Sequence, residues 1–351
     1  MFNIKVLSLF DGMACGMLAM IGGGISVESY HAYEIDKYDI QTATHNFPQI
    51  VECGDVFEAD FSKHKGIDFL IGGSPCTYWS IAQKNNRETE ASGIGWELFS
   101  QYVKALKEVK PKYFIYENNK SMSKAIRESI TKTFGFDAIC INSALVSAQN
   151  RQRLYWVGKR NDDGTYSKVD VQLPEDRGIL LKDILDGAVD LTSNGASGVA
   201  EMVDTSRQVG ALPRPNGELS TSQAFRVYDT NAKSVTLKAG GGGAGGKTGL
   251  YAIPIEFENG IPTKTISSSD GKTYTVYSVS NGIIVIKGKE YPIKLQNGYY
   301  IIRKLTISEC KRLQTVPEWY EFPVSNAQAY KMLGNGWTVD VITHLIKSCL
   351  K

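Results

Sequence analysis

A cysteine and a carboxylic acid each follow an apolar run, where they could take part in chemistry. Cys76 closes Gly72-Gly73-Ser74-Pro75-Cys76 at the end of the run Ile67–Gly73, and Glu117 ends the run Tyr113–Tyr116. A thiolate is a strong nucleophile, and a nearby carboxyl group can exchange a proton with a substrate. Simpler explanations remain open at this point, because such a cysteine can be a small buried residue and a lone acid at a strand end is usually solvated.

Two arginines form a third candidate group. Arg151 and Arg153 lie in Gln149-Asn150-Arg151-Gln152-Arg153, just before the strand pattern Leu154–Val157. Side chains at i and i+2 of an extended segment point to the same side. The pair could therefore hold a base oxygen and a phosphate, and a solvated polar loop is the alternative.

These residues need a scaffold, and the first half of the chain alternates strand and helix patterns. Helix-length segments separate the strands, which predicts an α/β fold with a doubly wound, mostly parallel, Rossmann-like sheet and helices on both faces. A crossover through Glu97–Lys107 would place the strand of Glu117 beside that of Cys76. The expected strands are Ile4–Phe10, His31–Ile35, Ile50–Cys53, Ile67–Gly73, Tyr113–Glu117 and Leu154–Val157, and the expected helices run to Met20, to Phe47, over Glu97–Lys107 and over Ser121–Phe134.

A glycine-containing turn after the first strand suggests a nucleoside site. Phe10-Asp11-Gly12-Met13-Ala14-Cys15-Gly16 is followed by Glu34 at the end of the second strand and by Gly54-Asp55-Val56 after the third. An acid roughly 20 residues after such a turn can bind ribose hydroxyls. The sequence lacks GxGxxG at this turn, which disfavours a dinucleotide and favours a nucleoside without phosphates, such as S-adenosylmethionine. A tight turn with a solvated Glu34 is the alternative.

The composition changes after about Lys159. From there to about Tyr300 the chain is rich in Gly, Ser, Thr and Asn, with hairpin signals at Asn281-Gly282 and Asn297-Gly298. Helical spacing returns at Ser308–Gln314 and Val339–Cys349. We therefore expect a discontinuous catalytic and cofactor-binding domain, 1–160 plus 303–351, and a loop-rich β domain at 161–302.

Composition and charge set further limits. The 351 residues are 42% hydrophobic and 22% charged with a net charge of +2, as in an ordinary globular protein. Neither a membrane span nor a secretory signal is apparent, so we expect a cytoplasmic protein. The 6 cysteines form no CxxC pair, which argues against a metal site or a disulfide framework. Bases outnumber acids between Arg207 and Lys294, which fits either a phosphate-binding surface or random scatter.

Two loops have special composition. Residues 77–95 are polar and without regular pattern, as in active-site lids. Gly241–Thr248 matches the phosphate-loop pattern GxxxxGK[ST], but Gly-Leu-Tyr-Ala-Ile-Pro follows it. Because this reads as a short strand broken by Pro254 and not as a helix, we reject an ATP site there.

Taken in order, the motifs resemble those of the cytosine-C5 DNA methyltransferases. The resemblance covers about the first 158 residues and the chain from Arg303 onward. It rests on Pro75-Cys76, Glu117-Asn118, Gln149-x-Arg151-x-Arg153, Arg303-x-Leu305-Thr306 with Glu309-Cys310-x-Arg312-Leu313-Gln314, and Gly334-Asn335-Gly336-Trp337-Thr338-Val339. The first and last motifs are also similar to the catalytic domain of the animal de novo methyltransferases.

The resemblance implies a DNA (cytosine-5-)-methyltransferase that flips a cytosine out of duplex DNA. Cys76 would add to C6, Glu117 would bind or protonate N3, Arg153 would contact O2, and Arg151 would orient the loop or a phosphate. S-adenosylmethionine would donate the methyl group and leave as S-adenosylhomocysteine. Its expected site is Phe10, Asp11, Gly12, Met13, Ala14, Glu34, Ile35, Asp55, Val56, Pro75, Asn335, Trp337 and Val339. The expected DNA contacts are Ser80, Gln149, Arg226, Lys238 and Lys247.

The expected partner is double-stranded DNA, bound by a monomer that associates with a cognate restriction endonuclease if it belongs to a restriction–modification system. Two departures stand out: Asn119 replaces the valine of the usual Glu-Asn-Val, and Ala14-Cys15 replaces paired glycines. Two other functions stay open, an RNA cytosine-C5 methyltransferase and an inactive DNA-binding regulator. The RNA-modifying relatives carry a Cys-Phe-Thr signature that is absent here, and inactive relatives lose Pro-Cys or Glu-Asn, which are both present.

Overall fold

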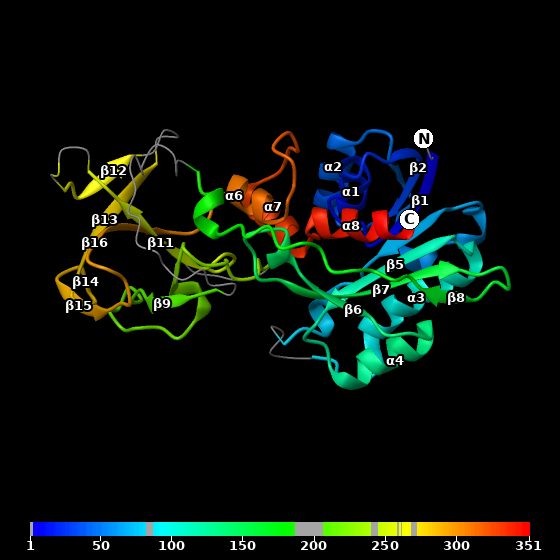
Figure 1. Ribbon diagram of the computed structural model, residues 1–351, viewed down its shortest axis with the longest axis horizontal. Helices are drawn as coiled ribbons and strands as arrows, with labels where there is room; N and C mark the ends of the chain where they lie inside the picture. Colours follow the sequence, from blue (N-terminus) through cyan, green and yellow to red (C-terminus); the bar gives the residue numbers. More distant parts are fainter. Residues whose placement is uncertain are drawn as a thin grey trace.

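The computed structural model describes residues 3–81, 87–186, 206–239, 245–257, 260, 262–267 and 272–351. The strands in this part of the chain form two eight-stranded sheets. Figure 1 shows the two sheets at opposite ends of the molecule, with α6 (Ile307–Leu313) and α7 (Asn326–Asn335) between them. Within the same residues, no helix combines the length and the apolar character needed to cross a membrane.

The first sheet has the strand order β3-β2-β1-β4-β5-β7-β6, with β8 paired to β7. Its strands are β1 (Asn3–Leu9), β2 (Ser26–Tyr33), β3 (Val51–Glu52), β4 (Phe69–Gly72), β5 (Tyr113–Asn119), β6 (Ile139–Asn142), β7 (Gln152–Arg160) and β8 (Tyr166–Lys168). The chain winds from β1 outward to β3, then returns to the other side of β1 with β4. A topological switch point therefore lies between β1 and β4, where ligands of such sheets bind at the carboxyl ends of the strands.

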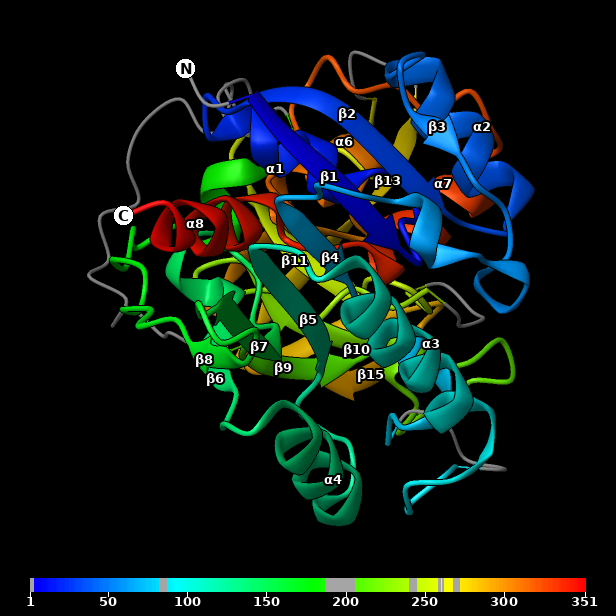
Figure 2. The same cartoon turned by 90° about the vertical axis from the view of Figure 1, so that its right-hand side faces the viewer.

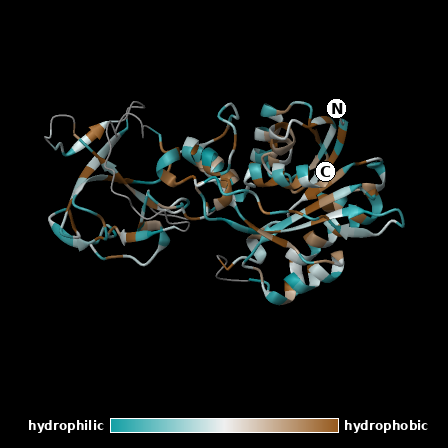
Figure 3. Cartoon of the chain, in the orientation of Figure 1, coloured by the Kyte–Doolittle hydropathy of each residue, from teal (hydrophilic) through white to brown (hydrophobic). Residues whose placement is uncertain are grey.

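Alternate residues of the central strands face opposite cores, because successive side chains of a strand point to opposite sides. Ile4 and Val6 of β1 pack in one core with α1 (Cys15–Gly22), α2 (Lys37–Asn46) and α8 (Val339–Cys349). Leu7 and Leu9 pack in the other with α3 (Gly93–Val109) and α4 (Lys124–Phe134). Figure 2 shows these two helix groups on opposite sides of β1, β4 and β5, and Figure 3 shows the hydrophobic residues on the strands between them. The expected doubly wound α/β fold is confirmed.

Several element bounds differ from the predicted ones. β2 starts at Ser26, earlier than the predicted His31, because polar and apolar residues alternate over its first half and hide the strand. β7 is longer than Leu154–Val157 and runs antiparallel to both β5 and β6. The helix predicted over Ser121–Phe134 begins at Lys124, where the Ser123 side chain accepts a hydrogen bond from the backbone N–H of Ile126. α7 was not predicted.

The second sheet has the order β15-β14-β13-β16-β11-β10-β9, with β12 paired to β13. Its strands are β9 (Gln208–Ala211), β10 (Arg226–Asp229), β11 (Leu250–Ile255), β12 (Thr265–Ser267), β13 (Thr273–Ser280), β14 (Ile283–Ile286), β15 (Lys289–Pro292) and β16 (Gly298–Arg303). Asn281-Gly282 joins β13 to β14 with positive φ at both residues, so this hairpin prediction is confirmed. The hairpin predicted at Asn297-Gly298 is wrong, because β16 pairs with β11 and β13 and not with the preceding β15.

Strand β11 also decides the glycine-rich segment. Residues 240–244 lie outside the described part, but Gly245–Thr248 form a turn that leads into β11. A strand, not a helix, follows the GKT triplet, in agreement with the rejection of an ATP site. Pro254 does not break the strand as expected. It stands where β11 pairs with β16 alone, since the pairing with β10 ends at Ala252, and an unpaired strand side tolerates the missing N–H.

The C-terminal helices return to the first sheet. α8 packs against α1, and α6 and α7 contribute Leu313, Met332 and Leu333 to a core that also contains Tyr251 and Ile301 of the second sheet. One hydrophobic core thus runs from the first sheet to the second. The division of domains at residues 160 and 302 stays a prediction, and β8, which lies beyond 160, pairs with β7 of the first sheet.

Candidate active site

The turn that carries Cys76 is tied to the neighbouring strand β5. After β4 ends at Gly72, Cys76 starts a 3-10 turn, Cys76–Tyr78. The Ser74 hydroxyl lies 2.6 Å from the Tyr116 hydroxyl, and the Asn118 amide donates to the Ser74 carbonyl at 3.1 Å. A Cβ on Gly73 would lie 2.8 Å from Glu117 Oε2, so glycine allows the turn to approach that carboxylate.

Glu117 points to the same sheet face as Ile115, toward α8 and the residues before it. Its Oε2 accepts a hydrogen bond from the Trp337 indole N–H at 2.9 Å. Its Oε1 lies 3.1 Å from Nε of Arg153 on the antiparallel strand β7. The residue is 9% exposed. Both carboxylate oxygens are therefore held by donors from distant segments.

The surroundings of Cys76 favour the neutral thiol. Burial raises the pKa of the Cys76 thiol, the positive charge of Arg153 opposes this shift, and the negative charge of Glu117 adds to it. Arg153 is thus placed to favour the thiolate that a nucleophile needs. The predicted proximity of thiol and carboxyl group is confirmed, because Cys76 and Glu117 line one cavity.

Arg151 acts as a clasp between distant backbone segments. It is 3% exposed, and its guanidinium donates to the carbonyls of Gly334 at 3.2 Å, Gly336 at 2.9 Å and Leu237 at 3.4 Å. It also lines the cavity with Arg153, as the i, i+2 spacing predicted. Its hydrogen bonds join the second sheet, the end of α7 and the Cys76 region.

A cavity of about 190 Å³ lies at the switch point between β1 and β4. It brings together the turn after β1, the turn after β4, the ends of β5 and β7, and the end of α7. Its lining residues are Phe10, Asp11, Gly12, Met13, Cys15, Glu34, Asp36, Asp39, Gly73, Ser74, Pro75, Cys76, Thr77, Glu117, Arg151, Arg153, Lys331, Met332, Asn335, Gly336 and Trp337.

Carboxylates dominate the β1 side of this cavity. Glu34 accepts hydrogen bonds from the backbone N–H groups of Gly12, Ile35 and Asp36 at 2.8–2.9 Å, which fixes the turn. Asp11 accepts from the Tyr30 hydroxyl, while its Oδ2 is shielded from solvent and has no hydrogen-bond partner. Burial raises the pKa of Asp11 to about 6, and burial together with the charges of Glu34 and Asp36 raises the pKa of Asp39 to about 7.

The cavity contains most of the predicted cofactor residues. Ala14, Ile35, Asp55, Val56 and Val339 do not line it. Ile35 is 71% exposed, Asp55 caps a 3-10 turn through the Phe57 N–H, and the other three are buried.

Sequence reasoning missed several lining residues, among them Asp36, Asp39 and Lys331. The first two follow Glu34 in Glu-Ile-Asp-Lys-Tyr-Asp, an acidic run that could have indicated them. Lys331 pairs with Asp36 at 2.5 Å and carries no local signal of this contact.

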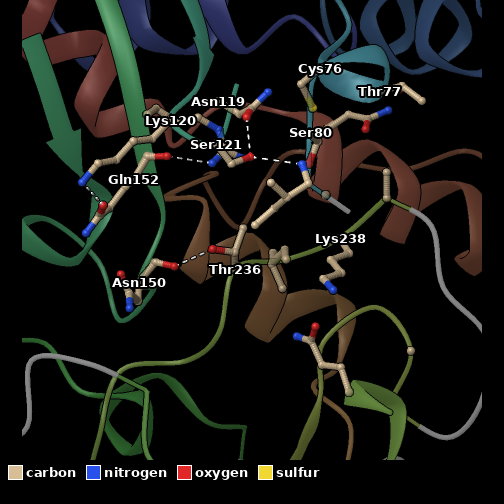
Figure 4. A pocket seen from close by; sticks show the side chains of 18 of the residues that line it. Cys76, Thr77, Ser80, Asn119, Lys120, Ser121, Asn150, Gln152, Thr236 and Lys238 are labelled. Carbon is tan, nitrogen blue, oxygen red and sulfur yellow. Dashed lines mark hydrogen bonds between the residues drawn. The ribbon is translucent and has the colours of Figure 1, made fainter. Parts of the chain in front are cut away.

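A larger cleft of about 1160 Å³ opens on the other side of Cys76. Cys76, Thr77, Arg153 and Asn335 line both hollows, so the thiol stands at their junction. Figure 4 shows Cys76, Thr77 and Ser80 along one side of the cleft and Thr236 and Lys238 on another. The described lining residues contain no carboxylate: they are Cys76, Thr77, Ser80, Ile81, Asn119, Lys120, Ser121, Asn150, Gln152, Arg153, Ser222, Gln223, Ala224, Thr236, Leu237, Lys238, Ala239, Gly246, Gly334 and Asn335.

The predicted DNA contacts divide into three groups. Ser80 and Lys238 line the cleft. Arg226 donates to the Thr221 carbonyl and Lys247 to the Ala327 carbonyl, both outside the lining. The contact predicted for Gln149 is not supported, because the residue is fully buried. Its side chain instead donates to Leu313 O and accepts from the Leu237 N–H, at 3.2 and 2.8 Å.

Among the described side chains, no group of three His, Cys, Asp or Glu is arranged to hold a metal ion.

Comparison with protein families gives one match that spans nearly the whole chain. The profile of the family described as C-5 cytosine-specific DNA methylase matches residues 4–351. The orphan methyltransferase M.Rho11sI of Bacillus phage rho11s is 28% identical over 346 residues, covering 80% of this chain and 68% of that protein. The orphan methyltransferase M.SPRI of Bacillus phage SPR is 26% identical, covering 100% of this chain and 98% of that protein. The type II methyltransferase M.HhaI of Haemophilus parahaemolyticus is 24% identical, covering 98% and 93%.

Solved structures share the fold. The crystal structure of the S. pombe Dnmt2 methyltransferase superposes with a TM-score of 0.59 at 15% identity, covering 99% of this chain and 98% of that chain. The Entamoeba histolytica methyltransferase EhMeth superposes with a TM-score of 0.60 at 13% identity, covering 100% and 98%.

Proposed function

This chain belongs to the family of C-5 cytosine-specific DNA methylases, and on that premise we propose that it transfers a methyl group from S-adenosylmethionine to C5 of a cytosine in double-stranded DNA. The observation that carries the proposal is the position of Cys76 where an acid-lined cavity meets a cleft without carboxylates. The cavity suits a cationic nucleoside, and the cleft suits a polyanion.

The residues around the small cavity fit S-adenosylmethionine. This molecule carries a sulfonium, an ammonium and ribose hydroxyls, but no phosphate. Asp11, Glu34 and Asp39 would attract its positive charges, and the same carboxylates would repel a pyrophosphate. The unpartnered Oδ2 of Asp11 is a buried acceptor for which a ligand donor would compensate. Phe10, Asn335 and Trp337 also line the hollow and would contact the ligand.

Cys76 would act as the nucleophile. Cytosine is a poor carbon nucleophile at C5, and addition of the Cys76 thiolate to C6 makes C5 enamine-like. When bound, S-adenosylmethionine supplies the electrophilic methyl group for that carbon. Loss of the C5 proton and elimination of the thiolate then release the methylated base and restore Cys76.

Glu117 and Arg153 would stabilise the reacting base. Trp337 and Arg153 hold the Glu117 carboxyl group beside Cys76, where it would bind or protonate N3 as negative charge develops on the ring. Arg153 lines both hollows and would contact O2. Arg151 would serve by positioning, because carbonyls occupy its guanidinium.

Cys76 cannot reach a base that is stacked in a duplex, so the cytosine must be extruded, at a cost of a few kcal/mol. Ser80, Lys120 and Lys238 line the cleft and would contact DNA. We further propose that the protein acts as a monomer in the cytoplasm, where bacterial and phage DNA lies. A cognate restriction endonuclease is the partner expected if it belongs to a restriction–modification system.

Bisulfite sequencing of a plasmid isolated from cells that express the protein tests the proposal. C5-methylated cytosines should appear in a fixed sequence context, and should be absent when Cys76→Ala is expressed instead. Unmodified plasmid together with methylated tRNA would favour the RNA methyltransferase. Specific DNA binding without methylation of either nucleic acid would favour an inactive regulator.

A further inference from the structure

Asn119 joins the strand that carries Glu117 to the loop that follows Cys76. Asn119 is 4% exposed and lines the cleft. Its Nδ2 donates to Asn118 Oδ1 at 3.0 Å, and its Oδ1 accepts from the Ser121 hydroxyl at 2.6 Å. The Ser121 oxygen in turn accepts from the backbone N–H of Ile81 at 3.4 Å. Figure 4 shows these links as dashed lines from Asn119 through Ser121 toward the loop beside Ser80.

The same short segment holds the loop at further points. Arg87 donates to the Ser121 carbonyl at 2.7 Å and to the Trp79 carbonyl at 3.2 Å. Ser123 donates to the Thr89 carbonyl. Residues 119–123 therefore anchor both described parts of the loop, 77–81 and 87–92.

This anchor reaches Cys76 from both sides. Before the cysteine, Asn118 Nδ2 donates to the Ser74 carbonyl. After it, the Ser80 N–H donates to the Cys76 carbonyl at 2.9 Å, and Ile81 is the next residue. A displacement of Ile81 would therefore be transmitted to the backbone of Cys76. The end of β5 sets the position of the nucleophile as well as that of Glu117.

We propose, on the basis of the function proposed above, that Asn119 is a positioning residue for Cys76, acting through Ser121 and Ile81. A serine hydroxyl has one proton to donate. Asn119 takes that proton and leaves a lone pair of Ser121 to accept the Ile81 N–H. A valine, which resembles the usual residue of the family here, has no acceptor. The Ser121 hydroxyl would then lose its fixed orientation, and the Ile81 contact would weaken.

Steady-state methylation of plasmid DNA with labelled S-adenosylmethionine tests the proposal, using Asn119→Val, Ser121→Ala and the double variant. Each single variant should lower kcat about tenfold, because small misplacement of a reacting group is costly. The KM for S-adenosylmethionine should stay within about twofold, since neither residue lines the small cavity. The double variant should be no slower than the slower single variant, because both changes break one chain of hydrogen bonds.

Ser100→Ala is the matched control, since it removes an exposed hydroxyl that bonds within α3. Trypsin cleavage after Arg87 provides a second measurement, and Asn119→Val should be cut faster than the wild type. Unchanged kcat in both single variants, or losses that multiply in the double variant, would overturn the proposal. If Asn119→Val fails to fold, Ser121→Ala, which removes a single oxygen, decides alone. An inactive wild type would instead count against the methyltransferase function itself.

Discussion

Glu117 of strand β5 accepts a hydrogen bond at 2.9 Å from the indole of Trp337, 220 positions later in the chain. The bond joins the middle of the first sheet to the turn between α7 and α8. With Arg153 on the other oxygen, it orients a buried carboxylate beside Cys76. The relationship has direct consequences for activity.

Trp337→Phe keeps the ring but removes the donor. A hydrogen bond to a charged group contributes about 1.5–3 kcal/mol, so the kcat of methylation should fall roughly ten- to a hundredfold. The control is Trp319→Phe, at a tryptophan that is 52% exposed and packs against Phe47, away from the site. A kcat equal to that of the wild type would show that the Trp337 bond does not help to orient Glu117.

Cys76→Ala should abolish methyl transfer while leaving the affinity for S-adenosylmethionine within about twofold, since an uncharged thiol contributes little to binding of a cationic ligand. Tritium transfer to DNA and isothermal titration calorimetry measure the two properties. Cys140→Ala, at an exposed cysteine, should behave as the wild type. Residual transfer by Cys76→Ala would rule out this thiol as the nucleophile.

Arg153→Gln should move the pH dependence of kcat/KM to higher pH. Burial already raises the pKa of Cys76, and Arg153 opposes that shift. Because the thiolate is the reactive form, the rate rises as pH approaches the thiol pKa, and loss of the cation moves that rise further upward. The exposed Arg160→Gln serves as the control. A rise at lower pH in Arg153→Gln would contradict the assignment.

Asp11→Asn should stabilise the ligand-free protein above about pH 6. Burial raises the pKa of Asp11 from 3.8 to about 6, so the folded state holds a proton that the unfolded state has lost. The stabilising effect of that proton is complete below pH 3.8 and is lost as pH rises to about 6. Asparagine removes this loss, worth about 2–3 kcal/mol.

Urea unfolding between pH 4 and pH 8 measures the Asp11 effect, with the exposed Asp162→Asn as the control. The difference between Asp11→Asn and wild type should grow over that interval and then level off. A difference independent of pH would refute the buried neutral carboxyl group.

Gly334→Ala should destabilise the junction between α7 and the second sheet. A Cβ at Gly334 would lie 2.3 Å from Ala239 N and 2.4 Å from Lys238 C, where only backbone can move. Such overpacking costs about 1–3 kcal/mol, and it would displace Lys238 from the cleft. The matched control Gly22→Ala meets only Thr343 at 3.6 Å. Equal melting temperatures of the two variants would refute the close approach.

The sequence predicted the local elements of the first sheet well, because each of its central strands is a buried apolar run. It also predicted that Cys76 and Glu117 meet, since a crossover helix between their strands makes the strands neighbours. The alternating start of β2 and the reversal of β7 were not predicted, because a strand pattern contains no information on direction.

What the sequence determined by itself was therefore the set of reactive groups, the family and the wound α/β fold, all encoded in short motifs and local periodicity. Only the tertiary structure showed that Gln149 is buried, that Arg151 binds the carbonyls of Gly334 and Gly336, and that Trp337 orients Glu117. These contacts join segments more than a hundred residues apart. They depend on how the sheets and C-terminal helices pack together, and no local pattern of residues carries that information.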